Sequence, residues 1–474
     1  MSSRKVITDV FVGGITRGTI RLRGLVFIPL ITISLGVDAF GAYAQILAIV
    51  NVLELVFGLG LYDSLVRYGK RTRETAEVYY SLTLVAGVSA ASMTCVMAFF
   101  AADLASLTLG SSEYGAALGV GALLILTRAM FRMAWNYFRI DSRIKLFSLI
   151  QWIKAYGIVV VVAISVLILD GGLAELFGSM VLWESFVFVA LQIQILREVG
   201  ITLPTFRGLR THLKFSIPVA LSRLAGNFSS RADRIMIGGF LGASAVGVYS
   251  IAYQIAAAIS IYVSPIQQTF FPEFSDLIDD GKFDRCRTYL RAGVRYFLMI
   301  ALPTVAGMYI VGPDLISILT NGQGIPSPVL IAIIALGIAV QGIERLYGVV
   351  IKAVEETGWR AKVIGAGAVL NVVVNAVAIP TLGILGAALT TLLTYLFAAV
   401  LMIGRVGRLL DTTLPWLTVV RCTGATFLMF VTTYLVFGIG GLLSIVVSPP
   451  VYFGLLFLFR ELTVSELRMR FIPN

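Results

Sequence analysis

Arginines are the residues with the clearest chemical potential in this 474-residue chain, because several interrupt segments that are otherwise apolar. One segment carries four polar residues within roughly 80° of one another on a helical wheel: Arg223, Asn227, Arg231 and Arg234. Counting about 1.5 Å per residue back from Gly242 places Arg231 roughly 16 Å deep in a membrane. A charge near the middle of a bilayer is costly, so this stripe predicts a functional site.

Two further segments carry arginines in the same way. In the first, the spacing of Arg17 and Arg21 puts them on one helix face, and Arg23 lies nearly opposite Arg21. Arg17 is close enough to the inner boundary for its side chain to reach the lipid headgroups instead. In the second segment, Arg128 and Arg132 share a face. We therefore predict that all five arginines contribute to substrate binding.

Anion capture is the chemistry that these arginines fit. A guanidinium can bind the oxygens of a diphosphate in a bidentate fork. The alternative is a structural network in which Asp233 holds neighbouring arginines, although one acid cannot neutralise three. Six polar residues are candidates for contacts with sugars, and each is equally suited to an interhelical hydrogen bond: Gln151, Lys154, Gln254, Gln341, Asn371 and Asn375.

Three acids are candidates for ion coupling: Glu54, Asp233 and Glu344. A buried carboxylate can couple transport to protons, or it can be a salt-bridge partner. The arginines next to Asp233 and Glu344 favour salt bridges. Glu54 has no basic neighbour in the sequence and lies about 16 Å below Tyr43, near the midplane. Glu54 is therefore the preferred coupling candidate.

The distribution of basic residues predicts the elements that position these groups. Lys and Arg are absent from seven apolar stretches, each long enough for two membrane helices and a short turn: 24–66, 74–127, 155–196, 235–281, 296–344, 363–404 and 422–459. All 37 basic residues lie in the intervening clusters, as the positive-inside rule requires. We predict an all-α polytopic membrane protein with about fourteen transmembrane helices and both termini in the cytoplasm.

The composition agrees with a membrane protein and excludes other classes. Charged residues make up only 13% of the chain, and the mean hydropathy is +0.92. The net charge of +11 follows largely from topology, and no nucleic-acid-binding motif is present. The three cysteines are scattered, and His212 is the single histidine. We expect no metal site, no cofactor, no catalytic residue set and no cleavable signal peptide.

A repeat relates two parts of the chain. Residues 35–44 (LGVDAFGAYA) match residues 241–250 (LGASAVGVYS) at an offset of 206, and the same offset carries Arg17 onto Arg223. We therefore predict an N-terminal six-helix bundle over 1–205 and a repeated bundle over 206–410. Residues 411–474 would form helices 13 and 14 with a cytoplasmic tail. Parallel repeats of this kind commonly bind substrate between the halves.

Short motifs in both halves carry a resemblance to a known family. They are residues 35–43, GLGL at 58–61, VRY at 66–68, FSIP at 215–218, ADRIMIG at 232–238, GVYS at 247–250, FPEFS at 271–275, and Asn371, Asn375, Pro380 and GAA at 386–388. The chain resembles the Wzx-type flippases of lipid-linked oligosaccharides over roughly residues 10–405. Their superfamily also holds multidrug extruders and lipid II flippases.

The resemblance implies two six-helix bundles around a central cavity and alternating access. The implied substrate is an undecaprenyl-diphosphate-linked oligosaccharide, moved across the bacterial inner membrane for exopolysaccharide or O-antigen lipopolysaccharide. Membrane lipids, a polysaccharide polymerase and a chain-length regulator are the implied partners.

Two alternatives stay open from the sequence. A multidrug extruder of the same superfamily should favour acids and aromatics around organic cations, whereas this chain has an arginine excess. A membrane polymerase or ligase acting on the same lipid commonly places catalytic residues in a large outer loop, whereas the predicted outer turns are short.

Reporter fusions test the predicted topology. Fusions at Gly110, Gly171, Gly242, Gly324, Gly383 and Gly440 should report the outside, and fusions at Lys70, Arg143, Arg210, Lys282 and Arg408 the inside. Two or more inverted sites would contradict the fourteen-helix arrangement.

Overall fold

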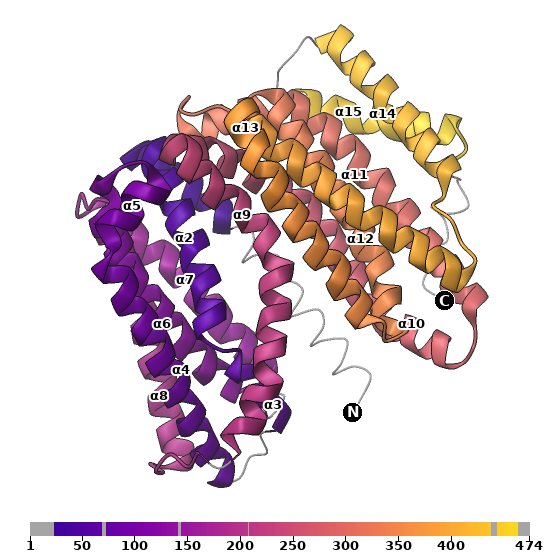
Figure 1. The fold of residues 1–474 in the computed structure, drawn as a ribbon. Coiled ribbons are helices and arrows are strands. Elements are labelled where there is room, and N and C mark those ends of the chain that lie inside the picture. Colours follow the sequence, from indigo (N-terminus) through magenta and orange to yellow (C-terminus); the bar gives the residue numbers. More distant parts are fainter. Residues whose placement is uncertain (1–22, 69–72, 141–143, 207, 438–442, 463–474) are drawn as a thin grey trace. The chain divides into compact units, whose positions relative to one another are not determined.

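The fold is known from a computed structural model that describes residues 23–68, 73–140, 144–206, 208–437 and 443–462 (Figure 1). Side chains in short parts of these ranges, including 225–230, are outside the description. Arg17, Arg21 and three of the fusion sites, Lys70, Arg143 and Gly440, lie outside the described residues.

Two compact units divide the chain, Met1–Ser250 and Ile251–Asn474. The first holds a helix Arg23–Leu35 and then α2 Val37–Phe57, α3 Leu61–Tyr68, α4 Arg73–Phe99, α5 Ala101–Leu109, η1 Ser112–Tyr114, α6 Gly115–Tyr137, α7 Ile144–Leu167 and α8 Leu173–Val199. Helix α9, Leu209–Ala256, continues across the division. The bundle limits near 205 and 410 remain a prediction from the sequence repeat. The division at residue 250 reflects how compactly the chain packs, which is a different property and does not test those limits.

The second unit continues with helices alone in its described part: η2 Ala257–Ile259, α10 Ser260–Asp279, α11 Phe283–Thr320, α12 Pro328–Ala353, α13 Thr357–Leu410, α14 Trp416–Phe437 and α15 Leu443–Leu458. Helices α14 and α15 lie beside α11 (Figure 1). Their contact includes the buried residues Met299, Cys422, Met429 and Tyr452.

The prediction of an all-α polytopic membrane protein is confirmed. Among the described residues, ten helices are long and apolar enough to cross a membrane, and two shorter apolar helices are Arg23–Leu35 and Ser444–Leu458. Helices α9 and α13 each contain a break in the helical backbone, at Gly242 and Gly383. Both glycines were predicted at outer turns. The number of membrane crossings stays a prediction.

The two turns of the sequence repeat have the same backbone conformation. Gly36 has φ 89° and ψ 168°, and Gly242, 206 positions later, has φ 82° and ψ 179°. This region of φ and ψ is accessible essentially to glycine alone. The matched glycines are therefore required by the same turn geometry in both copies.

Repeat-related backbones also pack against each other within the first unit. A Cβ atom on Gly41 would lie 1.8 Å from the carbonyl oxygen of Ala243, and one on Gly247 would lie 2.5 Å from the carbonyl oxygen of Val37. Gly41 and Gly247 are 206 positions apart, as are Val37 and Ala243. The contact is thus reciprocal, like a two-fold interface between identical surfaces. It brings α9 against α2.

Helix α6 is held in place by apolar and aromatic contacts. Tyr79 of α4 and Tyr137 of α6 lie in one buried cluster with Leu191 of α8. Trp135 packs against this cluster and stacks on Phe147 of α7 with ring centroids 3.8 Å apart. This packing fixes the rotation of α6, and with it the direction in which its arginines point.

Substitution of Gly41 tests the glycine contact. We expect Gly41→Ala to lower the free energy of unfolding by about 1–3 kcal/mol, since the added methyl meets backbone atoms that cannot give way. Gly307→Ala is the control, because a Cβ there has nothing within 4 Å. Unfolding midpoints in detergent measure both. Equal midpoints for the two variants would show that the glycine contact carries no stability.

Candidate functional site

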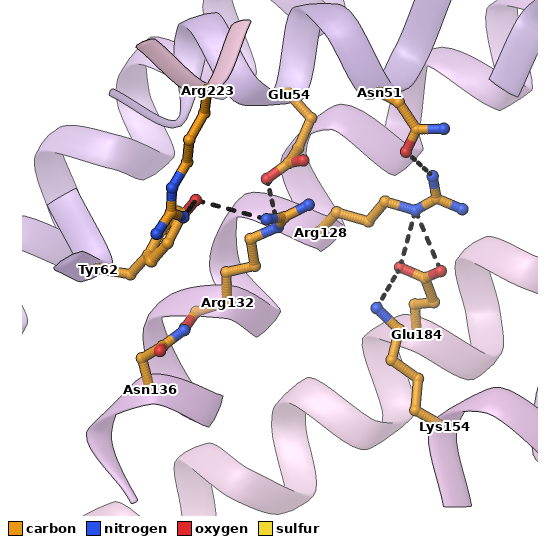
Figure 2. A network of polar contacts seen from close by, with 9 residues as sticks. All are labelled: Asn51, Glu54, Tyr62, Arg128, Arg132, Asn136, Lys154, Glu184 and Arg223. Atoms are coloured by element: carbon orange, nitrogen blue, oxygen red, sulfur yellow. Dashed lines mark hydrogen bonds and ion pairs between the residues drawn. The ribbon is translucent and has the colours of Figure 1, made fainter. Parts of the chain in front are cut away.

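Glu184 is the centre of a buried polar cluster on α2, α6, α7 and α8 (Figure 2). Its side chain is 1% exposed. Arg128 donates through Nε to both carboxylate oxygens, at 3.2 and 3.3 Å, and its Nη1 donates to Asn51 Oδ1 at 3.1 Å. Lys154 Nζ lies 3.2 Å from Glu184 Oε2 and 3.8 Å from the centre of the Phe131 ring. One carboxylate therefore holds two cations from two helices.

A second ion pair lies further along the same face of α6. Arg132 Nε lies 2.8 Å from Glu54 Oε1 of α2, although the contact is not aligned as a hydrogen bond. Tyr62 is shared by two arginines: its hydroxyl accepts from Arg223 Nη1 at 2.6 Å and from Arg132 Nη1 at 3.4 Å (Figure 2). Arg223 Nη2 also pairs with Asp63 at 2.8 Å. The cluster thus connects α9 to α6 through α3.

This cluster carries more positive charge than its acids neutralise. Arg128, Arg132 and Lys154 contribute three positive charges, and Glu54 and Glu184 contribute two negative ones, which leaves one positive charge in excess. Arg223 and Asp63 cancel. In a medium of low dielectric constant, an excess cation attracts an anion much more strongly than it would in water.

Arg231 adds to the excess. It is partly buried and makes no hydrogen bond or ion pair with any residue that the structure describes. It lies within electrostatic range of Arg234, Arg132, Glu54 and Arg128. Arg231 therefore adds a further positive charge beside the cluster.

The structure brings some of the predicted arginines together and places others apart. Arg128, Arg132 and Arg223 share the connected network. Arg23 lies over the Phe27 ring at 5.7 Å, and its Nη1 is 3.5 Å from the carbonyl oxygen of Ala155. Arg234, on α9, has a polar partner of its own. Arg17 and Arg21 lie outside the described residues, as does the side chain of Asn227. Substrate binding by these residues stays a prediction.

The acids predicted to form salt bridges have defined polar contacts. Glu344 pairs with Arg360 at 3.0 Å, rather than with the adjacent Arg345 that the sequence suggested. Asp233 is fully buried and accepts a hydrogen bond from Tyr249 at 3.0 Å. Both contacts join residues 16 positions apart in the chain. Glu344 and Arg360 are on different helices, and Asp233 and Tyr249 lie on opposite sides of the break at Gly242, so the spacing of a regular helix could not predict either contact.

Glu54 differs from the sequence expectation in two respects. It has no basic neighbour in sequence, but Arg132 contacts it in space. Helix α2 also begins at Val37, so Glu54 lies 17 residues, about 25 Å, from the predicted outer end rather than about 16 Å. The depth of about 16 Å predicted from the sequence was smaller because it was counted from Tyr43 rather than from Val37. Ion coupling through Glu54 stays a proposal, without the argument that the carboxylate lacks a cation.

Glu184 was missed by the sequence analysis, together with Asn51, Tyr62 and Asp63. A signal for Glu184 was present: it is an acid within the 155–196 stretch that lacks basic residues, and 11 residues, about 16 Å, from the start of α8. An acid at that depth requires a cationic partner. Lys154, named only as a candidate for sugar contacts, is one of the two that it has.

A family comparison identifies the group of proteins to which the chain is related. The family model described as polysaccharide biosynthesis protein matches residues 34–323, more than half of the chain. The chain belongs to this family. The resemblance drawn from the short motifs is thereby confirmed.

Individual relatives are similar over parts of their length. The chain is 22% identical to the probable low-salt glycan biosynthesis flippase of Haloferax volcanii, over 48% of each chain. It is 24% identical to the succinoglycan biosynthesis transport protein of Rhizobium meliloti, over 65% of this chain and 60% of that one. The matched part is thus less than two thirds of either relative. These relatives are named as transporters rather than enzymes.

Solved structures share the fold. The lipid II flippase MurJ in an inward closed conformation has a TM-score of 0.80, covering 95% of this chain and 99% of that chain at 14% identity. An inward-facing multidrug transporter of the MATE family has a TM-score of 0.68, covering 84% and 98% at 15% identity. At these identities the likeness shows the fold alone. Flippases and drug extruders share it, so the residues must distinguish the two activities.

Removal of one acid tests the Glu184 centre. Glu184→Gln should lower the free energy of unfolding by about 3–5 kcal/mol, since it leaves two buried cations without their carboxylate. Lys154→Met should cost clearly less, because Glu184 keeps Arg128. Unfolding midpoints of the two single variants in one detergent give the order. If Lys154→Met is the more damaging substitution, Glu184 is not the centre of the cluster.

Proposed function

We propose that this protein is a flippase for lipid-linked oligosaccharides, and that the cationic cluster of its first unit binds the diphosphate of the carrier lipid. Membership of the polysaccharide biosynthesis family supports the proposed transport of a lipid-linked oligosaccharide. The excess positive charge around Arg128, Arg132 and Lys154 supports the ligand, as does Arg231 beside it, which forms no ion pair with any described residue. That excess is the observation that carries the proposal.

Diphosphate fits this cluster better than a single negative charge does. A guanidinium offers parallel N–H donors, and a diphosphate offers oxygens on two phosphorus atoms. Arg231 would bind first, because no acid competes for it in the described structure. The paired Arg128 and Arg132 would then exchange part of their contact with Glu184 and Glu54 for the ligand. Alternating exposure of the site to the two sides of the membrane would complete transfer of the headgroup.

The cellular setting follows from the proposed substrate. The carrier is an undecaprenyl diphosphate bearing an oligosaccharide, assembled at the cytoplasmic face of a bacterial inner membrane. The protein would move it to the opposite leaflet for exopolysaccharide or O-antigen synthesis, next to a polymerase and a chain-length regulator. Transport of this kind breaks no covalent bond, so no catalytic group is needed.

The multidrug extruder alternative is less well supported by the cluster. Organic cations would be repelled by an excess of positive charge, and like charges placed together cost several kcal/mol. The shared fold with MATE transporters does not change this, since charge rather than fold selects the ligand.

Energy coupling is proposed for Glu54. Protonation of its carboxylate would neutralise the partner of Arg132 and free that guanidinium for the diphosphate. Glu184 is less suited, because its protonation would remove the negative charge that two cations, Arg128 and Lys154, share. Asp233 and Glu344 remain secondary candidates with structural contacts. A proton would thus bias the cycle by changing which group Arg132 binds.

Polymer export in cells tests the role of Arg231. Arg231→Ala should reduce export strongly at normal expression, and Arg231→Lys should restore only part of it, because Lys keeps the charge but loses the fork. Arg139→Ala is the control, since Arg139 is an exposed arginine of the same unit. Parental export by a well-expressed Arg231→Ala/Arg234→Ala double variant would remove these arginines from diphosphate binding.

Flipping in reconstituted vesicles tests the coupling role. An imposed pH gradient should stimulate the parent protein, and Glu54→Gln should weaken that stimulation while the protein stays folded. Asp233→Asn should instead lower expression, since Asp233 is buried and hydrogen-bonded to Tyr249. If Glu54→Gln responds to the gradient as the parent does, coupling lies elsewhere.

A further inference from the structure

A groove of about 550 Å³ lies on the second unit. Val340 and Ile343 of α12 form one wall, and Leu396, Val400 and Ile403 of α13 form the other. The segment 411–414 and Trp416 of α14 close one end. Val400 is 64% and Trp416 65% exposed. Apolar side chains on membrane-spanning helices face hydrocarbon, so a hydrocarbon chain suits this groove.

Two glycines form part of the groove. Gly404 and Gly407 line it, and a Cβ atom on Gly404 would have nothing within 4 Å. A side chain at Gly404 would therefore extend into open space along the wall. Larger residues there would fill the groove without straining the helix. Its depth thus depends on this missing side chain.

The end of the groove is polar and carries one charge of each sign. Arg408 and Asp411 both line it, and neither forms an ion pair with the other or with another described residue. Arg408 is in the last turn of α13, at the end predicted to be cytoplasmic. Trp416 lies beside them, and tryptophan is enriched where membrane meets water. The apolar wall therefore leads to a headgroup position at the inner interface.

We propose that this groove binds an aminophospholipid of the cytoplasmic leaflet, such as phosphatidylethanolamine. One acyl chain occupies the apolar groove, the phosphate meets Arg408, and the primary ammonium meets Asp411. A primary ammonium donates hydrogen bonds to a carboxylate, which a trimethylammonium cannot do. An anionic headgroup without an ammonium would place its charge beside Asp411 with no compensation. Opposite charges at the groove end thus select a zwitterion with N–H donors.

Native mass spectrometry of the full chain in detergent tests the proposal with three lipids of identical acyl chains: phosphatidylethanolamine, phosphatidylcholine and phosphatidylglycerol. Phosphatidylethanolamine should bind most tightly to the parent protein. Asp411→Asn should remove its advantage over phosphatidylcholine, a loss of roughly tenfold for one charge-assisted hydrogen bond. Arg408→Gln should weaken all three lipids, because each carries the phosphate.

The glycine variants locate the site. Gly404→Leu should abolish specific binding, whereas Gly365→Leu should bind as the parent does. Gly365 is on the same helix, away from the groove, and its Cβ position is equally open. Unchanged binding by Gly404→Leu would overturn the groove as the site. Equal affinity of the parent for all three lipids would overturn the headgroup assignment, even if Gly404→Leu reduced binding. Neither result depends on transport, so both are independent of the proposed substrate.

Discussion

Charge balance among buried side chains is the constraint on which the first unit depends. Two carboxylates, Glu54 and Glu184, must stabilise three cations that apolar helices carry away from water. Moving an ion out of water costs several kcal/mol, and its partner recovers this only with close contact. The lengthwise positions of α2, α6, α7 and α8 are therefore set by which cation must reach which acid. The same constraint leaves one positive charge in excess, and the proposed binding of diphosphate depends on this excess.

Backbone contacts bring α9 to this cluster. Gly41 and Gly247 let α2 and α9 approach until backbone touches backbone. Gln45 strengthens the contact, because its Nε2 donates to the carbonyl oxygens of Thr108 and Ile235 at 2.6 and 3.3 Å. Ile235 is next to Arg234 and one helical turn from Arg231. The packing of small residues thus positions the arginine stripe next to the cluster.

The features that could be predicted from the sequence are those that leave a pattern along the chain itself. Hydropathy and basic residues act over tens of residues, so the all-α membrane fold followed from the chain alone. The glycine turns followed from the repeat, since Gly36 and Gly242 need the same backbone conformation. The arginines of α6 were recognised because a charge in an apolar helix is costly wherever it points.

Partners across helices could not be predicted in the same way. Arg128 and Glu184 are 56 residues apart, and Arg223 and Asp63 are 160 apart. Which of them meet depends on helix rotation, and rotation is set by contacts such as Trp135 on Phe147. Glu54 illustrates the limit: its local sequence lacks a cation, yet α6 supplies Arg132. If every acid within an apolar stretch had been expected to pair with a cation, Glu184 would have been predicted as part of the site.

Headgroup selectivity tests the central claim most directly. Purified protein in vesicles should move a fluorescent oligosaccharide carried on undecaprenyl diphosphate, and the same oligosaccharide on undecaprenyl monophosphate should move at least about tenfold more slowly. Carrier and sugar are identical in the two substrates, so the ratio reports recognition of the second phosphate by the cationic cluster. Equal rates for the two carriers would contradict the account, since the excess positive charge would then have no part in selecting the substrate.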